Sequence, residues 1–482
     1  MHELTGSESD STVTRPRVSR RAVLGVGAAL AVVAAAGVRP ALAATSDGTR
    51  RPSARRRAYA FLDAAMDGYP ASGPNRLAQS YADQAGLFST AFVYDNALAI
   101  LAYLADDRSE SRSRAVVLGD ALLFAQNHDP DHTDGRLRQA YNVGPFTFYD
   151  GVLQRDGFVR ADGRANVGAQ FGFLGTMVGD MAWVGLAFTA LYRHTHARRF
   201  LDGAVRIGRW IETNARVDTG LGGYRGGVDA TDNRLPFHAT EHNIDLVALF
   251  GRLGDLTRDR VWRERRAHAV AFVTSMWQPA GGYFATGSND GVAANTAIIP
   301  EDVQTWSFLA LGAARFARSL DWAATKLKVV DDASRTNTTL TGGQRVSGVT
   351  FSSQSLLANE SAPIAPFQPK PNRNGVWFEG SAHLAAALRQ RCSRGDESLA
   401  RRLLDQVELA QDTLGVAQTI GGRVLPERAG VVSASSPLDT GFGFGYYPNR
   451  HLGATAWYLL AQARANPLAG RNKDRDEDRD ED

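Results

Sequence analysis

Cysteine is the residue that this sequence has least of. Cys392 is the only one among 482 residues, so no disulfide bond can form within the chain. The folded state must therefore be stabilised by a hydrophobic core, and a chain of this length has enough residues to bury a large one.

An excess of charge of one sign is also absent. The chain has 54 Lys and Arg residues against 51 Asp and Glu residues, which gives a formal net charge of +3. Apart from a dense run within residues 50–57, the basic residues are scattered and form no stripe that would follow a nucleic-acid backbone. We therefore expect no nucleic-acid partner.

A long apolar run is missing as well. The longest, residues 22–38, is about 17 residues, whereas a bilayer-spanning helix needs about 20. It follows Arg20-Arg21 and precedes Ala41-Leu42-Ala43. These features predict a signal peptide over residues 1–43 for the twin-arginine export machinery, cleaved after Ala43, and a secreted or envelope protein without a membrane span. An uncleaved anchor is the alternative.

The mature chain is an alternation of two kinds of helical segment, with a predicted linker at 44–54 and a disordered charged tail at 469–482. One kind is apolar nearly all round, so protein must surround it; the other is amphipathic and rich in arginine. The apolar segments are 91–104, 180–192, 241–253, 302–316, 379–388 and 452–463. The amphipathic segments are 54–66, 112–126, 198–213, 260–277, 319–330 and 397–414.

Six buried helices covered by six amphipathic ones predict an all-α fold, a single (α/α)6 toroid over residues 55–468. An open superhelix of helix pairs is the alternative, but it would expose its terminal inner helices. Glycine turns recur between the helices and favour short β-hairpin excursions at the mouth of the ring. They are Asp134-Gly135, Gly222-Gly223, Gly281-Gly282, Gly342-Gly343 and Gly421-Gly422.

Polar and aromatic residues gather where the apolar helices begin. Glu241, Asp245 and Glu379 lie on apolar segments, where an unpaired charge costs several kcal/mol. Asp180 and Asp302 also suit helix N-caps. An alignment on the alanine one turn later makes Asp95 equivalent to three tryptophans, which are either core residues or aromatic platforms for a sugar. These are Trp183, Trp306 and Trp457.

Several of these motifs resemble bacterial proteins of the six-hairpin glycosidase-like superfamily. The similar segments are Thr240-Glu241-His242-Asn243-Ile244-Asp245, Asp302-Val303-Gln304-Thr305-Trp306, Trp377-Phe378-Glu379-Gly380 and Gly453-Ala454-Thr455-Ala456-Trp457 with Asn466-Pro467. The resemblance spans about residues 59–467 and implies an (α/α)6 toroid with a glycan site at the mouth of the inner helices.

Glycoside hydrolysis by a pair of carboxyl groups is the leading hypothesis for the chemistry. Glu241 and Glu379 are the expected pair, followed by Asp302 and Asp95. We expect a poly- or oligosaccharide substrate, no cofactor and no metal; the acidic loop at 129–134 lacks a complete calcium-loop pattern. The expected substrate-binding residues are Tyr94, Asp180, Trp183, His242, Asn243, Asp245, Trp306, Trp377 and Trp457.

Two other functions remain open at this stage. A polysaccharide lyase or a sugar epimerase would use a histidine or tyrosine to abstract a proton beside a carbonyl or carboxylate, and a non-catalytic glycan-binding protein would need no such group. Candidates for the proton abstraction are Tyr94, His238, His242, His383 and His451.

Overall fold

The computed structural model describes residues 53–69, 73–106, 108–366 and 368–469. The predicted signal peptide, nearly all of the linker, and the charged tail beyond Ala469 lie outside the described residues. Ser53 caps the first helix by accepting a hydrogen bond from the Arg56 amide, so the ring begins at Ala54. No helix within the described ranges is long and apolar enough to span a bilayer.

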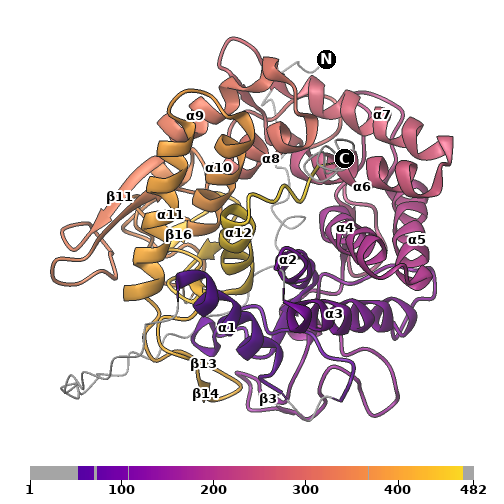
Figure 1. Cartoon of the computed structure of the whole chain (residues 1–482), viewed down its shortest axis with the longest axis horizontal. Helices are drawn as coiled ribbons and strands as arrows, with labels where there is room; N and C mark the ends of the chain where they lie inside the picture. The colour runs from indigo at the N-terminus through magenta and orange to yellow at the C-terminus, as the bar shows by residue number, and fades with distance from the viewer. Residues whose placement is uncertain (1–52, 70–72, 107, 367, 470–482) are drawn as a thin grey trace, which may run out of the picture.

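The helices form a closed double ring, which confirms the predicted toroid (Figure 1). Each inner helix packs against the next, and the last packs against the first, so no inner helix has an open flank as it would in a superhelix. The inner helices are α2 (Val93–Leu104), α4 (Val178–Thr195), α6 (Thr240–Thr257), α8 (Glu301–Leu311), α10 (Phe378–Arg391) and α12 (Leu452–Gln462). The outer helices are α1 (Ala54–Met66), α3 (Ser109–Asn127), α5 (Arg198–Ala215), α7 (Arg260–Ser275), α9 (Arg318–Lys326) and α11 (Asp396–Thr413).

Short antiparallel pairings join the segments at the mouth of the ring. The extended residues just before each inner helix pair with the segment that follows the next outer helix along the ring. Three of these pairings are β1 (Thr90–Phe92) with β2 (Ala140–Asn142), β5 (Thr176–Met177) with β6 (Gly227–Val228), and β7 (His238–Ala239) with β10 (Gly287–Ser288). The others are single bridges: Pro300 with Ser352, Trp377 with Ala434, and His451 with Tyr81. The last joins the two ends of the chain and closes the ring.

The remaining strands form further pairs. They are β3 (Phe146–Thr147) with β4 (Leu153–Gln154), β8 (Trp277–Gln278) with β9 (Tyr283–Phe284), β11 (Lys328–Asp332) with β12 (Arg345–Val349), β13 (Thr419–Ile420) with β14 (Arg423–Val424), β15 (Val431–Val432) with β18 (Arg450–His451), and β16 (Leu438–Asp439) with β17 (Gly445–Tyr446). Predicted glycine pairs lie in the turns of three of these hairpins, at 281–282, 342–343 and 421–422.

Two helices are shorter than the sequence predicts. The inner helix expected to reach residue 316 ends at Leu311, because Gly312 adopts a left-handed φ of 60°. The outer helix expected to reach residue 330 ends at Lys326, and the β-branched pair Val329-Val330 lies in strand β11 instead.

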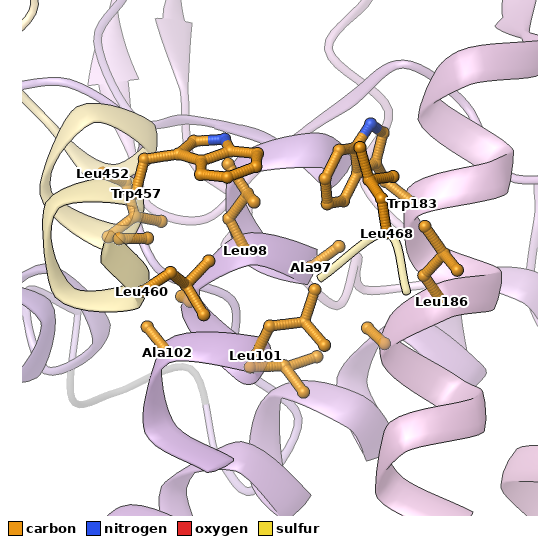
Figure 2. Close-up of a cluster of buried hydrophobic side chains, with 14 of the residues drawn as sticks. Ala97, Leu98, Leu101, Ala102, Trp183, Leu186, Leu452, Trp457, Leu460 and Leu468 are labelled. Atoms are coloured by element: carbon orange, nitrogen blue, oxygen red, sulfur yellow. The ribbon is translucent and has the colours of Figure 1, made fainter. Parts of the chain in front are cut away.

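The C-terminal segment plugs the ring on the side away from the helix N-termini. Leu468 is fully buried beside Leu186 and Trp183, as Figure 2 shows. The buried Arg252 of α6 donates to the carbonyls of Pro467 at 2.5 Å and Ala469 at 3.1 Å. Ala469, which the sequence assigned to the tail, therefore belongs to the packed ring.

Candidate active site

One repeated hydrogen bond fixes the level of all six inner helices. In each, the fourth helical residue accepts a backbone N–H from the segment between the preceding outer helix and itself, at 2.8–3.2 Å. The acceptors are Asn96, Met181, Asn243, Gln304, Ser381 and Thr455, and the donors are Ala78, Leu137, Tyr224, Phe284, Val349 and Val431. Residues at equal distances from these acceptors therefore lie at the same height in the ring.

This register brings predicted acids to one level. Two residues before the acceptor stand Tyr94, Gly179, Glu241, Asp302, Glu379 and Gly453. Two residues after it stand Leu98, Trp183, Asp245, Trp306, His383 and Trp457. The alanine-based alignment was wrong for the first inner helix: Asp95 is level with Asp180, and Leu98 is level with the tryptophans. Alanine recurs at both Ala99 and Ala102, so a shared alanine does not define a register.

The two glycines at the acid level make room for their neighbours. A Cβ atom on Gly179 would lie 2.5 Å from the ring of His242. On Gly453 it would lie 2.7 Å from Asp95 Oδ1 and 3.0 Å from Glu379 Oε2. These positions therefore cannot carry a larger side chain without displacing an ionisable group.

A cavity of about 260 Å³ opens at this mouth. Three predicted residues line it, Tyr94, Asp95 and Asp180, together with His451. No Lys or Arg is among its lining residues, and its acidic and imidazole side chains are those of Asp95, Asp180 and His451. Aromatic and amide side chains from the loops complete the wall: Tyr81, Phe92, Gln139, Phe173, Gln368, Phe444, Tyr446, Tyr447 and Asn449.

Buried acids and imidazoles alternate below the cavity. His451 Nε2 lies 3.1 Å from Asp95 Oδ1, and His451 Nδ1 lies 3.4 Å from Glu379 Oε2. His383 Nε2 lies 3.7 Å from Glu379 Oε1, and His383 Nδ1 lies 3.2 Å from Glu301 Oε2. All five side chains are at most 3% exposed. They come from α2, α8, α10 and the residue before α12, so only the closed ring brings them together.

Glu379 is held as the carboxylate of this group. Burial by itself would raise its pKa, but hydrogen bonding and ion pairing with His383, the charge of His451 and the hydroxyl of Tyr94 together lower it below its ordinary value. Tyr94 Oη donates to Glu379 Oε1 at 2.6 Å and accepts from the indole of Trp457 at 3.0 Å.

A second group of acids retains protons. Burial and the adjacent charge of Asp302 raise the pKa of Glu241 well above its ordinary value. Burial raises the pKa of Asp302 to about 6, that of Asp180 to about 8, and that of Asp245 well above its usual range. The Glu241 side chain is still 36% exposed, so solvent and a ligand can reach it. This group therefore contains both protonated and ionised carboxyls at neutral pH.

The tryptophans form the floor of the site. Trp183, Trp306 and Trp457 are at most 5% exposed, and their ring centroids lie 5.2–5.9 Å apart. Trp377 is 2% exposed and stacks on Tyr446. None of the four lines the cavity, so they pack as core beneath the site rather than presenting open faces to a sugar.

Asn243 is the predicted binding residue whose position differs most from expectation. It is fully buried, and its amide accepts from the Tyr224 N–H and donates to the Tyr224 and Ala239 carbonyls. Its side chain holds the backbone and has no free group for a hydroxyl. His242 lies beside Glu241 at 3.4 Å, with burial lowering its pKa to about 4, so it is neutral at neutral pH.

The acidic side chains of the loop at 129–134 form ion pairs with arginines. Arg138 pairs with Asp129 at 2.5 Å and with Asp131 at 3.1 Å, and Arg136 pairs with Asp134 at 2.8 Å. Within the described ranges, no group of three or more His, Cys, Asp or Glu side chains is placed to hold a metal ion.

Sequence reasoning missed Glu301 and underrated two histidines. Glu301 immediately precedes the predicted Asp302, and its own position on an apolar helix was the available signal. His451 and His383 were named only for the alternative reactions, because Asp95 and Glu301, the acids that pair with them at 3.1 and 3.2 Å, lie on other helices. The loop residues Tyr81 and Tyr446 carried no pattern that marked them as cavity walls.

Comparisons with known proteins establish the fold. No family model and no curated protein sequence matches this chain. Among solved structures, a cellobiose 2-epimerase from Bacillus thermoamylovorans is similar with a TM-score of 0.56 at 10% identity, covering 85% of this chain and 98% of that one. A D-mannose isomerase gives 0.52 at 13% identity, covering 87% and 99%. A family 76 glycoside hydrolase from a bovine Bacteroides thetaiotaomicron strain gives 0.51 at 11% identity, covering 86% and 78%. The chain thus has the six-hairpin (α/α)6 toroid fold.

Proposed function

We propose that this protein is an exported carbohydrate-active enzyme, and specifically a glycoside hydrolase that acts on an uncharged glycan. The observation that carries the proposal is a set of buried carboxyl groups with separated pKa values at the mouth of the ring, beside a cavity that is lined by Asp95, Asp180 and aromatic and amide side chains. The structurally similar cellobiose 2-epimerase, D-mannose isomerase and family 76 glycoside hydrolase support it.

The cavity wall suits a sugar ring. Tyr81, Phe92 and Tyr446 offer aromatic faces, on which the CH faces of a sugar pack. Gln139, Asn449 and Asp95 offer donors and acceptors for hydroxyl groups. A concave site that is largely apolar with a few polar groups is typical of small-molecule recognition.

The acid is best assigned to Glu241 together with Asp302, whose side chains are hydrogen-bonded to each other. The pKa of Glu241 is raised well above its ordinary value, and this residue would donate its proton to the glycosidic oxygen as the bond from that oxygen to the anomeric carbon breaks. Asp302, with a pKa of about 6, would hold that proton with Glu241. Acid and base lie at least about 5 Å apart in glycosidases, so the base would be a third carboxyl group, Asp95, which lines the cavity. Glu379, the expected partner of Glu241, is already engaged by two imidazoles and a phenol.

The acids and the cavity belong to one site. Tyr446 lines the cavity, and burial together with nearby negative charge raises its pKa well above its ordinary value. The contributing carboxylates are Glu379, Asp95, Asp302 and Glu241.

No Lys or Arg is among the described residues that line the cavity, which disfavours a lyase. A lyase that abstracts a proton beside a sugar carboxylate must neutralise that carboxylate, and the wall supplies carboxylates instead. Sugar epimerisation is the second candidate, because His451 lines the cavity between Asp95 and Glu379 and stacks under Tyr81 at 4.1 Å. Its imidazole would take the proton from the carbon beside a carbonyl.

The two reactions are separated by their products. The purified mature protein would be incubated with neutral oligosaccharides and polysaccharides in ¹⁸O water and, separately, in deuterium oxide. Hydrolysis adds one ¹⁸O to each released reducing end. Epimerisation cleaves no glycosidic bond and so adds no ¹⁸O by hydrolysis. In deuterium oxide it replaces one carbon-bound hydrogen of the sugar by deuterium. Selective conversion of uronate polymers to unsaturated products would overturn the proposal.

A further inference from the structure

We infer that His383 is an imidazolium at neutral pH built into the floor of the site, and that Glu301 and His383 act as positioning residues that hold Glu379 ionised and oriented beneath the cavity. The catalytic meaning of this pair rests on the proposed function, whereas its charge state does not.

Both ring nitrogens of His383 face carboxylates. Nδ1 lies 3.2 Å from Glu301 Oε2 and Nε2 lies 3.7 Å from Glu379 Oε1. A neutral imidazole has one N–H and one lone pair, so it would turn a lone pair toward one of these carboxylates. Burial raises the pKa of Glu301 to about 7, below the value of about 9 for His383, so the proton of this pair resides on the imidazole. The imidazolium then directs one N–H at Glu301 and the other toward Glu379.

Three indoles enclose the same ring. The His383 ring centroid lies 4.3 Å from that of Trp457 and 5.2 Å from those of Trp306 and Trp377, all in edge-to-face arrangements. His383 itself is 0% exposed. The indoles therefore exclude water from the ring and leave its charge state to the two acids beside it.

The titratable groups around His383 come from several elements of the ring. His383 is faced by Glu301 and Asp302 from α8 and by Glu379 from its own helix α10, with Tyr94 of α2 and His451 beyond Glu379. Among the described cavity-lining residues there is no Lys or Arg. Burial alone would lower the pKa of His383, but hydrogen bonds and charge from Glu301 and Glu379 raise it to about 9.

The consequence reaches the cavity through Glu379. With His383 charged, Glu379 remains a carboxylate, accepts the hydrogen bond of Tyr94 at 2.6 Å and pairs with His451 at 3.4 Å. Tyr94 and His451 both line the cavity. Glu301, which is fully buried and does not line the cavity, thus acts on the site only through His383 and Glu379.

The test is a histidine titration of the full mature protein, labelled with ¹⁵N at histidine and followed by long-range ¹H–¹⁵N NMR, with no ligand added. We expect His383 to carry protons on both nitrogens at pH 7 and to titrate near pH 9. Glu301→Gln should lower that pKa by at least one unit, and Glu301→Asp should restore part of the shift. Glu408→Gln, a glutamate on α11 that accepts from Tyr458, is the matched control and should leave it unchanged.

Each outcome decides the inference. A wild-type His383 that is neutral at pH 7, or an unchanged titration in a folded Glu301→Gln protein, would overturn it. The wild-type titration suffices if Glu301→Gln does not fold. A confirmed imidazolium in a protein that turns over no glycan would reject the proposed function alone. Where turnover is found, Glu301→Gln should move the pH profile of kcat with little change in KM.

Discussion

Individual residues in this ring differ in function because their surroundings move their pKa values in opposite directions. Glu241 and Glu379 stand at the same level of the ring, on helices α6 and α10 with α8 between them. Burial and the adjacent Asp302 raise the pKa of the first, whereas His383, His451 and Tyr94 lower that of the second, although burial acts on both. Glutamate thus serves as a proton donor at position 241 and as a hydrogen-bond acceptor that holds Tyr94 and the histidines at position 379.

The raised pKa values predict that stability falls with rising pH. Asp180 has a pKa of about 8 and His383 of about 9, so between pH 6.5 and 9 the folded state holds more protons than the unfolded state. The free energy of unfolding must then decrease across this window, whereas the lowered pKa of His242 acts only below it. Thermal melts from pH 6.5 to 9 should show a falling midpoint, and Asp180→Asn should flatten the curve. A midpoint that rises with pH would contradict these assignments.

Asn243 should act on stability rather than on binding. Asn243→Ala would leave the N–H and carbonyl of Tyr224 buried without their partner, at a cost of about 1–3 kcal/mol for each unsatisfied group. Urea denaturation should therefore report a loss of about 2 kcal/mol or more. Unchanged stability with weaker glycan binding would restore the role that the sequence first suggested.

At the scale of elements, the site depends on two positions where an inner helix has glycine instead of a residue with a side chain. Alanine normally stabilises a helix by about 1 kcal/mol relative to glycine. At Gly179 and Gly453 the added Cβ would instead meet His242, or Asp95 and Glu379, at 2.5–3.0 Å. Helix propensity and site geometry therefore oppose each other at these two positions.

Gly453→Ala is the sharper of the two tests. We expect it to reduce turnover at least tenfold and to displace the His451 resonances in histidine-labelled spectra, because the methyl group enters the space between Asp95 and Glu379. Gly254→Ala on α6 is the control: its nearest contact would be an ordinary 3.6 Å, so it should be neutral or stabilising. Wild-type turnover and spectra in Gly453→Ala would refute the close packing of these acids.

The elements were largely predictable from the sequence, and their mutual register was not. Apolar and amphipathic periodicity predicted all six helix pairs, because the spacing of apolar residues along a helix depends on which of its faces are buried. Recurrent alanines left the height of α2 undefined, and only the hydrogen bond from Ala78 to Asn96 sets it. The Asp95–His451 pair joins residues 356 positions apart, so no local pattern announces it.

At the scale of the whole molecule, closure and plugging hold the mouth in shape. The Tyr81–His451 bridge and the α12–α2 contact join the ends of the chain at the site itself. At the opposite end, Leu468 packs beside Trp183 of the tryptophan floor (Figure 2). Arg252 donates hydrogen bonds to the carbonyls of Pro467 and Ala469. Deletion of residues near the chain ends should therefore affect the site, although the deleted residues do not belong to it.

Truncation tests this coupling. Deletion of residues 466–482 removes Leu468 and leaves the Arg252 guanidinium without two of its carbonyl acceptors, so we expect a loss of about 3–5 kcal/mol in unfolding free energy. Deletion of residues 471–482 keeps these contacts and is the control. Equal midpoints for the two truncated proteins in chemical denaturation would show that the plug contributes nothing.

Export is a prediction of the same scale and has its own test. Replacement of Arg20-Arg21 by two lysines should retain the protein in the cytoplasm, and N-terminal sequencing of the exported form should begin at Ala44. Export of the Lys-Lys variant, or an exported form that still contains residues 22–38, would contradict the signal-peptide assignment.

Turnover by carboxamide variants measures the central claim most directly. On the neutral glycan identified by product analysis, Glu241→Gln and Asp302→Asn should each lower kcat by about 10²–10⁴-fold, since each removes an acid–base group. Their thermal midpoints should stay near or above that of the wild type, because each replaces a buried carboxyl by a neutral amide. Glu264→Gln on the outer helix α7 should turn over at the wild-type rate. If both carboxamide variants also kept the wild-type rate, the acids at the mouth would not be the site of the chemistry.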